Sequence, residues 1–255
     1  MNKTINLNAD LGESFGAWSM GDDESLLDIV ASANIACGFH AGDPLVMRRT
    51  VAAAKKRGVS IGAHPAFPDL QGFGRRRMDI PATELEAMII YQIGALQAMA
   101  AAEGSCVSHV KPHGALNNMA CADAALADCV ARAIHAISPQ LILLAPAYSR
   151  LATAGESIGL PVILEIFADR AYQDDGQLMP RSQPGAMIHG TDAALAHVLR
   201  MLDEQAIVSV NGKRLPTRVQ SICVHGDNPE AVATASDLRR GIEAAGYSIA
   251  SLDRL

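Results

Sequence analysis

Short apolar segments recur along the chain, and each is closed by polar residues, glycine or proline. Their length of four to six residues and their β-branched or aliphatic side chains are typical of buried strands. The pattern predicts seven strands, at Thr4–Ala9, Ala33–Ala36, Val59–Ala63, Cys106–Val110, Leu141–Ala145, Val162–Ile166 and Val219–Val224.

Longer stretches with helical spacing separate these segments. Asp43 and Pro44 are typical of a helix start, and the helix they open runs to about Arg57. The segment Thr83–Glu86 fits a capping box and opens a helix that ends near Gly104. Further helices are predicted at Ala122–Ala136, Asp192–Gln205 and Pro229–Ala245, and Tyr247–Leu252 is a candidate terminal strand.

The alternation of strands and helices predicts a parallel sheet with helices outside. Seven or eight such units fit a closed (β/α) barrel better than an open sheet, so we expect a single α/β domain over residues 1–255. One segment breaks the rhythm, because Ile207–Val210, Asn211-Gly212 and Lys213–Leu215 predict a β-hairpin with a type I′ turn. This hairpin, near residues 207–216, is expected to leave the barrel before its last strand.

Composition narrows the class of protein. Hydrophobic residues make up 49% of the 255 residues and charged residues 19%, which predicts a large core rather than disorder. The net charge of −6, without a Lys/Arg-rich run, argues against a nucleic-acid partner. We find neither a signal-peptide stretch at the start nor 18 consecutive uncharged apolar residues, and five scattered cysteines lack a CxxC pair. We therefore expect a reduced, cytoplasmic protein without a membrane partner.

Titratable residues collect immediately after the predicted strands. In a parallel barrel, the side chains that follow the strands meet at one end, where active sites lie. This convergence predicts an enzyme. The candidates are Asp10, Glu13, His40, His64, Lys111, His113, Glu165, Asp169, Arg170, His225 and Asp227.

Several of these polar residues have a structural interpretation as well. Asp43 fits a helix cap better than a catalytic acid, and Asp227 fits either role. His109 alternates within its strand and could point outward to a helix, whereas Cys37 is interpreted as a buried packing residue rather than a nucleophile. Lys111 ends an apolar strand and precedes Pro-His-Gly, which favours a functional role.

A glycine- and arginine-rich segment, Gln71–Arg77, is a second candidate site. Arg75 and Arg76 could hold a phosphate or carboxylate, or they could be solvated in a mobile loop. The sequence contains neither a Walker loop nor a GxSxG elbow. Asp10, His40 and His64 could bind a divalent ion, but their spacing is not a local metal motif, and we favour a metal-free acid/base site.

Long motifs of the chain resemble the LamB/YcsF family. They are Asn6-Leu7-Asn8-Ala9-Asp10-Leu11-Gly12-Glu13, Ala33-Asn34-Ile35-Ala36-Cys37-Gly38-Phe39-His40-Ala41-Gly42-Asp43, Gly62-Ala63-His64-Pro65, Gly72-Phe73-Gly74-Arg75-Arg76, Val110-Lys111-Pro112-His113-Gly114-Ala115-Leu116, Glu165-Ile166-Phe167-Ala168-Asp169-Arg170-Ala171-Tyr172 and His225-Gly226-Asp227. The resemblance covers nearly the whole chain in order. It implies an irregular, seven-stranded TIM-like barrel, similar to glycoside hydrolase and deacetylase barrels.

The resemblance also implies an activity. Members of the family are the barrel subunit of an ATP-dependent 5-oxoprolinase, which opens the lactam of 5-oxo-L-proline to L-glutamate while ATP becomes ADP and phosphate. The implied co-substrate is ATP, and the implied partners are two further subunits, B and C. Because a Walker loop is missing, nucleotide could bind at a subunit interface.

Such a reaction needs an acid, a base and cations around a phosphoryl group. Our hypothesis assigns acid/base roles to His40, His64 or His225, oriented by Asp10 or Asp227. It assigns Lys111, Arg170, Arg75 and Arg76 to the substrate carboxylate or phosphate, with Glu13, His113, Glu165 and Asp169 completing the lining. Two alternatives stay open: a metal-dependent deacetylase or sugar hydrolase, and a non-catalytic binding or regulatory subunit.

Overall fold

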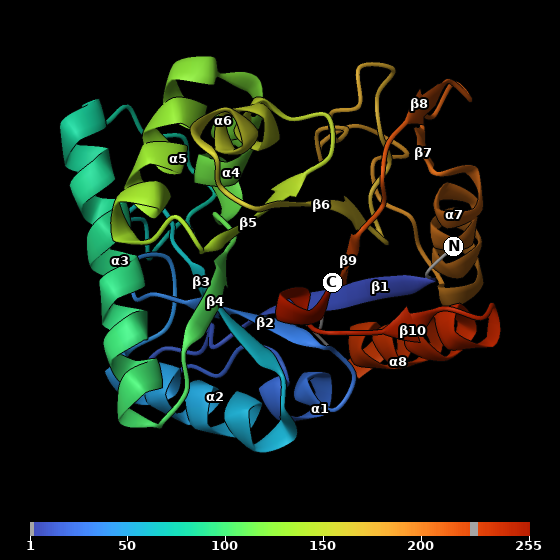
Figure 1. Cartoon of the computed structure of the whole chain (residues 1–255). Coiled ribbons are helices and arrows are strands. Elements are labelled where there is room, and N and C mark those ends of the chain that lie inside the picture. Colours follow the sequence, from blue (N-terminus) through green and yellow to red (C-terminus); the bar gives the residue numbers. More distant parts are fainter. Residues whose placement is uncertain (1–2, 225–228) are drawn as a thin grey trace.

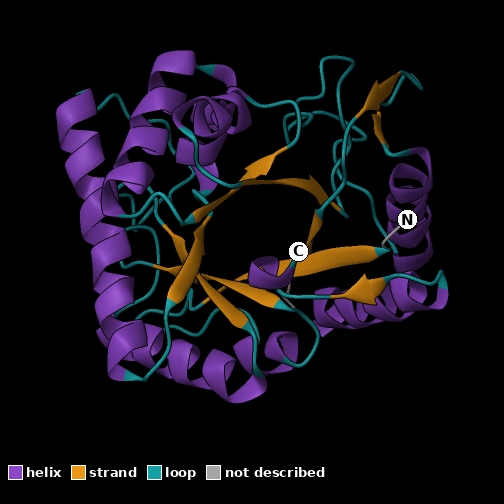
Figure 2. Cartoon of the chain, in the orientation of Figure 1, coloured by secondary structure: helices purple, strands orange, loops and turns teal. Residues whose placement is uncertain are grey.

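Seven parallel strands form a closed barrel in the computed structural model, which describes residues 3–224 and 229–255. The strands are β1 (Thr4–Leu11), β2 (Ser32–Ala36), β3 (Ser60–His64), β4 (Val107–Val110), β5 (Ile142–Pro146), β6 (Val162–Phe167) and β9 (Ser221–Val224). Pairing of β9 with β1, from Asn6↔Ser221 to Ala9↔Val224, closes the ring that Figure 2 shows. The structure confirms the predicted barrel, and all seven predicted strands lie within two residues of observed ones.

Helices surround the barrel (Figure 1). They are α1 (Asp23–Leu27), α2 (Pro44–Arg57), α3 (Ala82–Ala102), α4 (Gly114–Ala122), α5 (Ala124–Ile137), α6 (Arg150–Ile158), α7 (Thr191–Glu204) and α8 (Pro229–Ala244). The helix predicted at Ala122–Ala136 corresponds to α5, whereas α1, α4 and α6 were missed. Helix α5 begins after Asp123, whose side chain caps it through the N–H groups of Ala125 and Leu126.

Two predicted helix starts had different outcomes. Asp43 caps α2 as expected, accepting hydrogen bonds from the N–H groups of Leu45 and Val46. The capping box at Thr83 is wrong, because α3 begins at Ala82 directly after Pro81 and no side chain caps it. Thr83 is therefore already inside the first turn.

The long helix α3 is apolar enough to span a membrane by length and composition, the one such helix in the described residues. Its buried residues fall on one face and include Leu85, Ile89, Ile93 and Leu96. This face is packed against the barrel between α2 and α5, which is the position of a core helix in a barrel wall.

The barrel is irregular between β6 and β9. Residues 168–190 form a long loop, and α7 is followed by a hairpin of β7 (Ala206–Val208) and β8 (Arg214–Pro216). The hairpin is where it was predicted, but the type I′ turn is wrong, since Gly212 has a positive φ and Asn211 does not. Five residues form the turn because Ser209 and Asn211 are hydrogen-bonded to Asp174 of the long loop.

The interior of the barrel is polar near the start of its strands. The side chains of Asn6, Asn8, Asn34, His109 and Ser221 are fully buried there. His109 does not point outward to a helix, because its Nε2 lies 3.1 Å from Oδ1 of Asn34. Gly62 of the neighbouring strand β3 lies against the His109 ring. A Cβ at this position would overlap the ring, so β3 requires glycine here.

The last residues of the chain cover that end of the barrel. Strand β10 (Ser248–Ile249) pairs with β1, and the 3-10 turn η1 (Leu252–Arg254) follows, in front of the barrel opening in Figure 1. The Asn6 side chain donates to the carbonyl of Ala250 at 2.8 Å, and the N–H of Leu252 donates to Ser32. The opposite end, where the strands finish, is left open for the cavity.

Candidate active site

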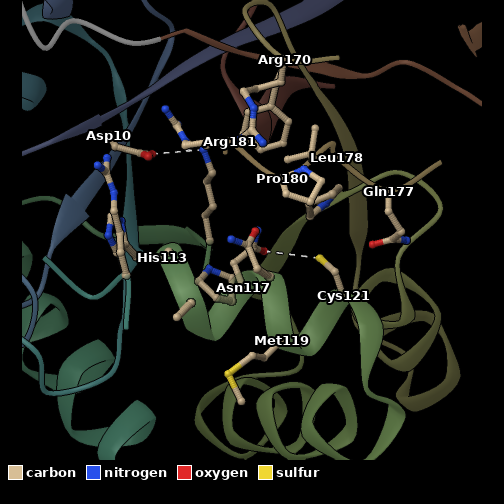
Figure 3. Close-up of a pocket in the computed structure, with 18 of the residues that line it drawn as sticks. Asp10, His113, Asn117, Met119, Cys121, Arg170, Gln177, Leu178, Pro180 and Arg181 are labelled. Carbon is tan, nitrogen blue, oxygen red and sulfur yellow. Dashed lines mark hydrogen bonds and ion pairs between the residues drawn. The ribbon is translucent and has the colours of Figure 1, made fainter. Parts of the chain in front are cut away.

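A cavity of about 530 Å³ opens at the C-terminal ends of the strands. It lies between those ends and the loops that follow β3 and β6, with α4 forming one side. In Figure 3, Asp10 and His113 face it from one side, and Gln177 and Pro180 of the long loop lie across from them. The polar residues of the lining are Asp10, Glu13, His64, Arg75, Arg77, Lys111, His113, Asn117, Asn118, Arg170, Tyr172, Gln177 and Arg181.

Lys111 lies at the centre of the strand-end side. Its Nζ is 3.1 Å from Oδ1 of Asp10 and 3.4 Å from Oε2 of Glu165, and it also donates to Asn8 at 3.2 Å. The Sγ of Cys223 is a fourth neighbour, at 3.1 Å. The lysine is 3% exposed and Glu165 is 1% exposed, so both charged groups depend on these partners rather than on water.

The charges in this group shift one another's pKa values. Burial alone would lower the pKa of Lys111, but neighbouring anions, Asp10 above all, raise it well above its usual value. Burial raises the pKa of Glu165, and the Lys111 charge opposes that shift only in part. Lys111 is therefore the permanent cation of the site, and Asp10 is the carboxylate that it holds at the cavity wall.

Three histidines form a cluster beside this group. Nδ1 of His113 lies 3.0 Å from Nε2 of His64, which in turn lies 3.2 Å from Oδ2 of Asp10. The His40 and His113 rings are stacked with centroids 3.8 Å apart, and Nε2 of His40 is 3.3 Å from Oε1 of Glu13. Burial lowers the pKa of His113 to about 3 and that of His40 well below its usual value.

Two backbone carbonyls orient the cluster. Nδ1 of His64 lies 2.6 Å from the carbonyl oxygen of Lys111, and Nε2 of His113 lies 2.8 Å from that of Phe73. Phe73 has a positive φ of 54°, an unusual conformation for a residue with a Cβ. The loop holding Phe73 is fixed by Asp69, whose buried carboxylate accepts hydrogen bonds from Gly72 and Arg76.

Arginines form the other side of the cavity. Arg170 is buried and donates to the carbonyl of Met179 at 2.6 Å, and burial together with the Arg181 charge lowers its pKa. The Arg75 guanidinium lies over the Phe73 ring, 5.0 Å from its centroid. Arg75, Arg77 and Arg181 are exposed at the cavity. This side is suited to an anionic ligand, because guanidinium groups bind carboxylates and phosphates through paired hydrogen bonds.

The predicted residues do not all meet at the cavity. Those that line it are Asp10, Glu13, His64, Lys111 and His113, with Arg75 and Arg170 across from them. His40 and Glu165 contact these residues without lining the cavity. Arg76 points to Asp69 and is not part of the lining, and Asp169 is half-buried outside it. His225 and Asp227 lie outside the described residues. Asp43 caps helix α2. Cys37 is a buried packing residue, and burial raises the pKa of its thiol to about 12.

Several residues that line the cavity or contact its lining were missed from sequence. Cys223 lies within a predicted strand, and its contact with Lys111 had no signature in the pattern. Asn117 follows the Lys-Pro-His-Gly segment by three residues, so its place in the first turn of a helix could have been inferred from that spacing. Arg77, Gln177 and Arg181 are loop residues, for which periodicity gives no position.

One group of side chains could hold a metal ion. Glu13, His40, His64 and His113 each offer a ligand atom, and these atoms all lie within 4.8 Å of one another. The set suggested by sequence, Asp10 with His40 and His64, differs in its carboxylate and lacks His113. Asp10 is nearby, but it contacts Lys111 and Asn34 as well as His64.

Two known proteins that are similar to this chain over nearly its whole length carry the same name. A protein from Azoarcus sp. (strain BH72), named as the A subunit of 5-oxoprolinase, is 61% identical over 251 residues, which cover 98% of each chain. A protein of the same name from Bacillus subtilis (strain 168) is 51% identical over 248 residues, 97% of this chain and 96% of that one.

Solved structures agree with these relatives. A lactam utilization protein from Thermus thermophilus superposes with a TM-score of 0.92 at 42% identity, covering 98% of this chain and all of that one. The catalytic domain of a peptidoglycan N-acetylglucosamine deacetylase from Eubacterium rectale ATCC 33656 has a TM-score of 0.53 at 13% identity and covers 99% of this chain and 89% of that one, so it shares the fold alone. The LamB/YcsF family profile matches residues 5–255. The chain therefore belongs to the LamB/YcsF family.

Proposed function

We propose that this chain is a subunit of an ATP-dependent 5-oxoprolinase, and that its cavity is where the lactam of 5-oxo-L-proline is opened. Relatives at 51–61% identity over nearly the full chain are named as the A subunit of 5-oxoprolinase, which supports the assignment to that enzyme. The observation that carries the site is the Lys111–Asp10 pair, which faces an arginine-lined cavity at the strand ends.

The cavity matches the chemistry of the substrate. 5-Oxo-L-proline is a small ring with one carboxylate and one amide, and the exposed arginines offer partners for a carboxylate or a phosphoryl group. We assign the carboxylate to Arg170 and Arg181, which lie together on the long loop. The ring amide is then directed toward Asp10 and Lys111, with Arg75 and Arg77 beside it for a phosphoryl group.

Ring opening requires that the amide lose its resonance. Transfer of the γ-phosphoryl group of ATP to the amide oxygen gives ADP and an activated ring carbon. A water molecule adds to that carbon, the bond from carbon to ring nitrogen breaks, and the C–O bond to phosphate breaks with uptake of a second water. The products are L-glutamate, ADP and phosphate.

In this scheme Asp10 takes a proton from the attacking water and returns it to the departing nitrogen. Lys111 stabilises the carboxylate form of Asp10, and it stabilises the negative charge that develops on the oxygen of the attacked ring carbon. The sequence alone favoured histidine as the acid/base group. The geometry favours Asp10, because the ring nitrogens of His64 and His113 are directed to backbone carbonyls and to each other, whereas Asp10 lines the cavity beside the Lys111 cation.

We place nucleotide binding at an interface with partner subunits, in line with the multi-subunit enzyme that the relatives' names imply and with the missing Walker loop. We propose that the partners are subunits B and C, that ATP is the co-substrate, and that the complex is cytoplasmic. Arg75 and Arg77, exposed at the cavity rim, are positioned to contact a phosphate delivered from a neighbouring subunit.

The test is to measure L-glutamate and ADP formed from 5-oxo-L-proline and ATP in three mixtures: this chain alone, subunits B and C alone, and all three. We expect activity in the full mixture only. Unchanged activity without this chain would overturn the proposal, and would leave a regulatory or unrelated role.

A metal-dependent deacetylase or sugar hydrolase is the second candidate. The group formed by Glu13, His40, His64 and His113 favours it. Metal-dependent release of acetate from N-acetylated sugars by this chain alone would support this candidate, and its absence would leave the 5-oxoprolinase proposal.

A further inference from the structure

We propose that Glu13, His64 and His113 bind a divalent transition-metal ion such as Zn²⁺, with His40 next to it as a fourth ligand. The inference concerns the histidine cluster at the cavity wall, and it does not depend on the reaction proposed above. It stands on the protonation that the surroundings of two histidines require.

Each of these histidines already donates one ring proton. A carbonyl oxygen only accepts hydrogen bonds, so Nδ1 of His64, 2.6 Å from the Lys111 carbonyl, must carry hydrogen. By the same argument Nε2 of His113 carries hydrogen, because it lies 2.8 Å from the carbonyl of Phe73. In the neutral rings the remaining nitrogens, Nε2 of His64 and Nδ1 of His113, are therefore bare acceptors.

These two bare nitrogens face each other at 3.0 Å. The surrounding atoms are acceptors too, with Oδ2 of Asp10 at 3.2 Å from Nε2 of His64 and Oε1 of Glu13 at 3.8 Å from Nδ1 of His113. Two acceptor nitrogens that face each other repel one another, particularly where the histidines are buried. A cation between them removes the conflict.

A metal ion satisfies this group better than a shared proton does. One proton placed between His64 and His113 joins only those two nitrogens, whereas one metal ion can bind both of them together with a carboxylate oxygen of Glu13. Charge points the same way, since the carboxylates of Asp10 and Glu165 share Lys111, and a third carboxylate, Glu13, lies beside the histidines. Two ligands of one tetrahedral Zn²⁺ lie about 3.3 Å apart when each bond is about 2.05 Å, close to the observed spacing.

The surroundings are also those of metal-binding histidines. Such residues usually donate their second ring N–H to a carbonyl or carboxylate, which fixes the ring orientation, as the carbonyls of Lys111 and Phe73 do here. Imidazole nitrogens with one carboxylate favour Zn²⁺ or related transition metals, whereas Mg²⁺ and Ca²⁺ favour sites made of oxygen.

The test is direct binding of Zn²⁺ to the full-length chain after treatment with a chelator, followed by calorimetric titration. We expect one equivalent of Zn²⁺ to bind, and millimolar Mg²⁺ not to compete. Co²⁺ should bind at the same site and give a visible absorption band. Binding well below one equivalent, or displacement by Mg²⁺, would overturn the inference.

Variants locate the ion. Glu13→Gln and His113→Ala should each weaken Zn²⁺ binding by at least about 100-fold, which exceeds the usual loss from a supporting residue. His189→Ala, an exposed histidine outside the cavity, is the matched control and should bind like the unaltered chain. Circular dichroism checks that each variant folds, and Glu13→Gln keeps the side-chain volume if His113→Ala does not fold. Unchanged affinity in folded Glu13→Gln would overturn the assignment.

The two proposals fail separately. Stoichiometric Zn²⁺ binding by a chain that is dispensable for 5-oxoproline hydrolysis would support this inference and overturn the proposed function. A chain that is required for hydrolysis but binds no transition metal would do the reverse.

Discussion

The two sides of the cavity are built in different ways. On the strand-end side, Lys111 and Glu165 are almost fully buried, and each polar group there contacts several others. On the loop side, Arg75 and Arg181 are exposed, and their partners are a ring face and a methionine sulfur. The first side has its geometry fixed by the barrel, whereas the second can adjust to a ligand or a neighbouring subunit.

This difference separates two kinds of function. Groups that move protons or hold a metal need fixed positions, and rigid strands supply them. Groups that capture an anion from solution need reach and charge, and long exposed side chains supply those. Substitutions on the fixed side should therefore affect turnover, and substitutions on the loop side should affect affinity.

The largest effect is expected for Lys111→Met. It removes the cation that holds Asp10 and Glu165, so kcat of the assembled enzyme should fall by about 10³-fold. Steady-state kinetics of the three-subunit mixture checks this, with circular dichroism to confirm that the variant is folded. A folded variant with nearly unchanged kcat would remove Lys111 from the reaction.

A comparison of two glycines tests how tightly the strand-end side of the cavity is packed. A Cβ at Gly74 would lie 2.8 Å from Cδ2 of His113 and 2.8 Å from Cβ of His40, while a Cβ at Gly58 would meet nothing. Both glycines have a positive φ, so alanine strains the backbone to a similar extent at the two positions. Gly74→Ala should lower the free energy of unfolding by about 1–3 kcal/mol more than Gly58→Ala. Urea denaturation measures this, and equal losses would show that the histidines can move aside.

On the loop side, Arg181→Met should raise KM for 5-oxo-L-proline by about tenfold with little change in kcat. The reason is that a charged hydrogen bond to the substrate carboxylate contributes equally to the bound substrate and to the transition state. The matched control is Arg218→Met, an exposed arginine outside the cavity lining, which should leave KM unchanged. A fall in kcat for Arg181→Met instead would place this side in the chemical step.

The smallest effect is expected at Asp43, a carboxylate that caps α2. Its side chain accepts hydrogen bonds from Leu45, Val46 and Gly16, and nothing directs it to the cavity. Asp43→Ala should lower the free energy of unfolding by about 1 kcal/mol and leave kcat unchanged. Thermal unfolding and steady-state kinetics check the two parts, and lost activity at nearly unchanged stability would assign Asp43 to the site.

The strand pattern was sufficient to predict the barrel, because each buried strand has a short apolar sequence that polar residues close. Helix α6 was missed because Gly155 breaks its helical pattern. That glycine is needed for close packing, since a Cβ there would lie 2.6 Å from Leu143. The turn of the hairpin was predicted wrongly for a similar reason, because Asp174 binds it from a distant loop.

The candidate site, like the fold, could be predicted from the sequence only in part. Asp10, His64 and Lys111 could be placed together from sequence because parallel strands bring their ends to one edge of the barrel. The sequence could not show that Arg76 binds Asp69 while Arg77 lines the cavity, since adjacent loop residues can point in any direction. Nor could it show which nitrogen of His64 faces His113, which depends on two backbone carbonyls.

The closure of the barrel has a consequence for the order of folding. Strand β1 is made first, yet it pairs with Ser221–Val224 along one edge and with Ser248–Ile249 along the other, and both are synthesised more than 200 residues later. Contacts so distant in sequence slow folding, and until they form the growing chain exposes an unpaired strand edge. During synthesis Asn6 and Asn8 can therefore meet Ser32 and Asn34 early, but they must wait for almost the entire chain before Ala250 and Ser221 arrive.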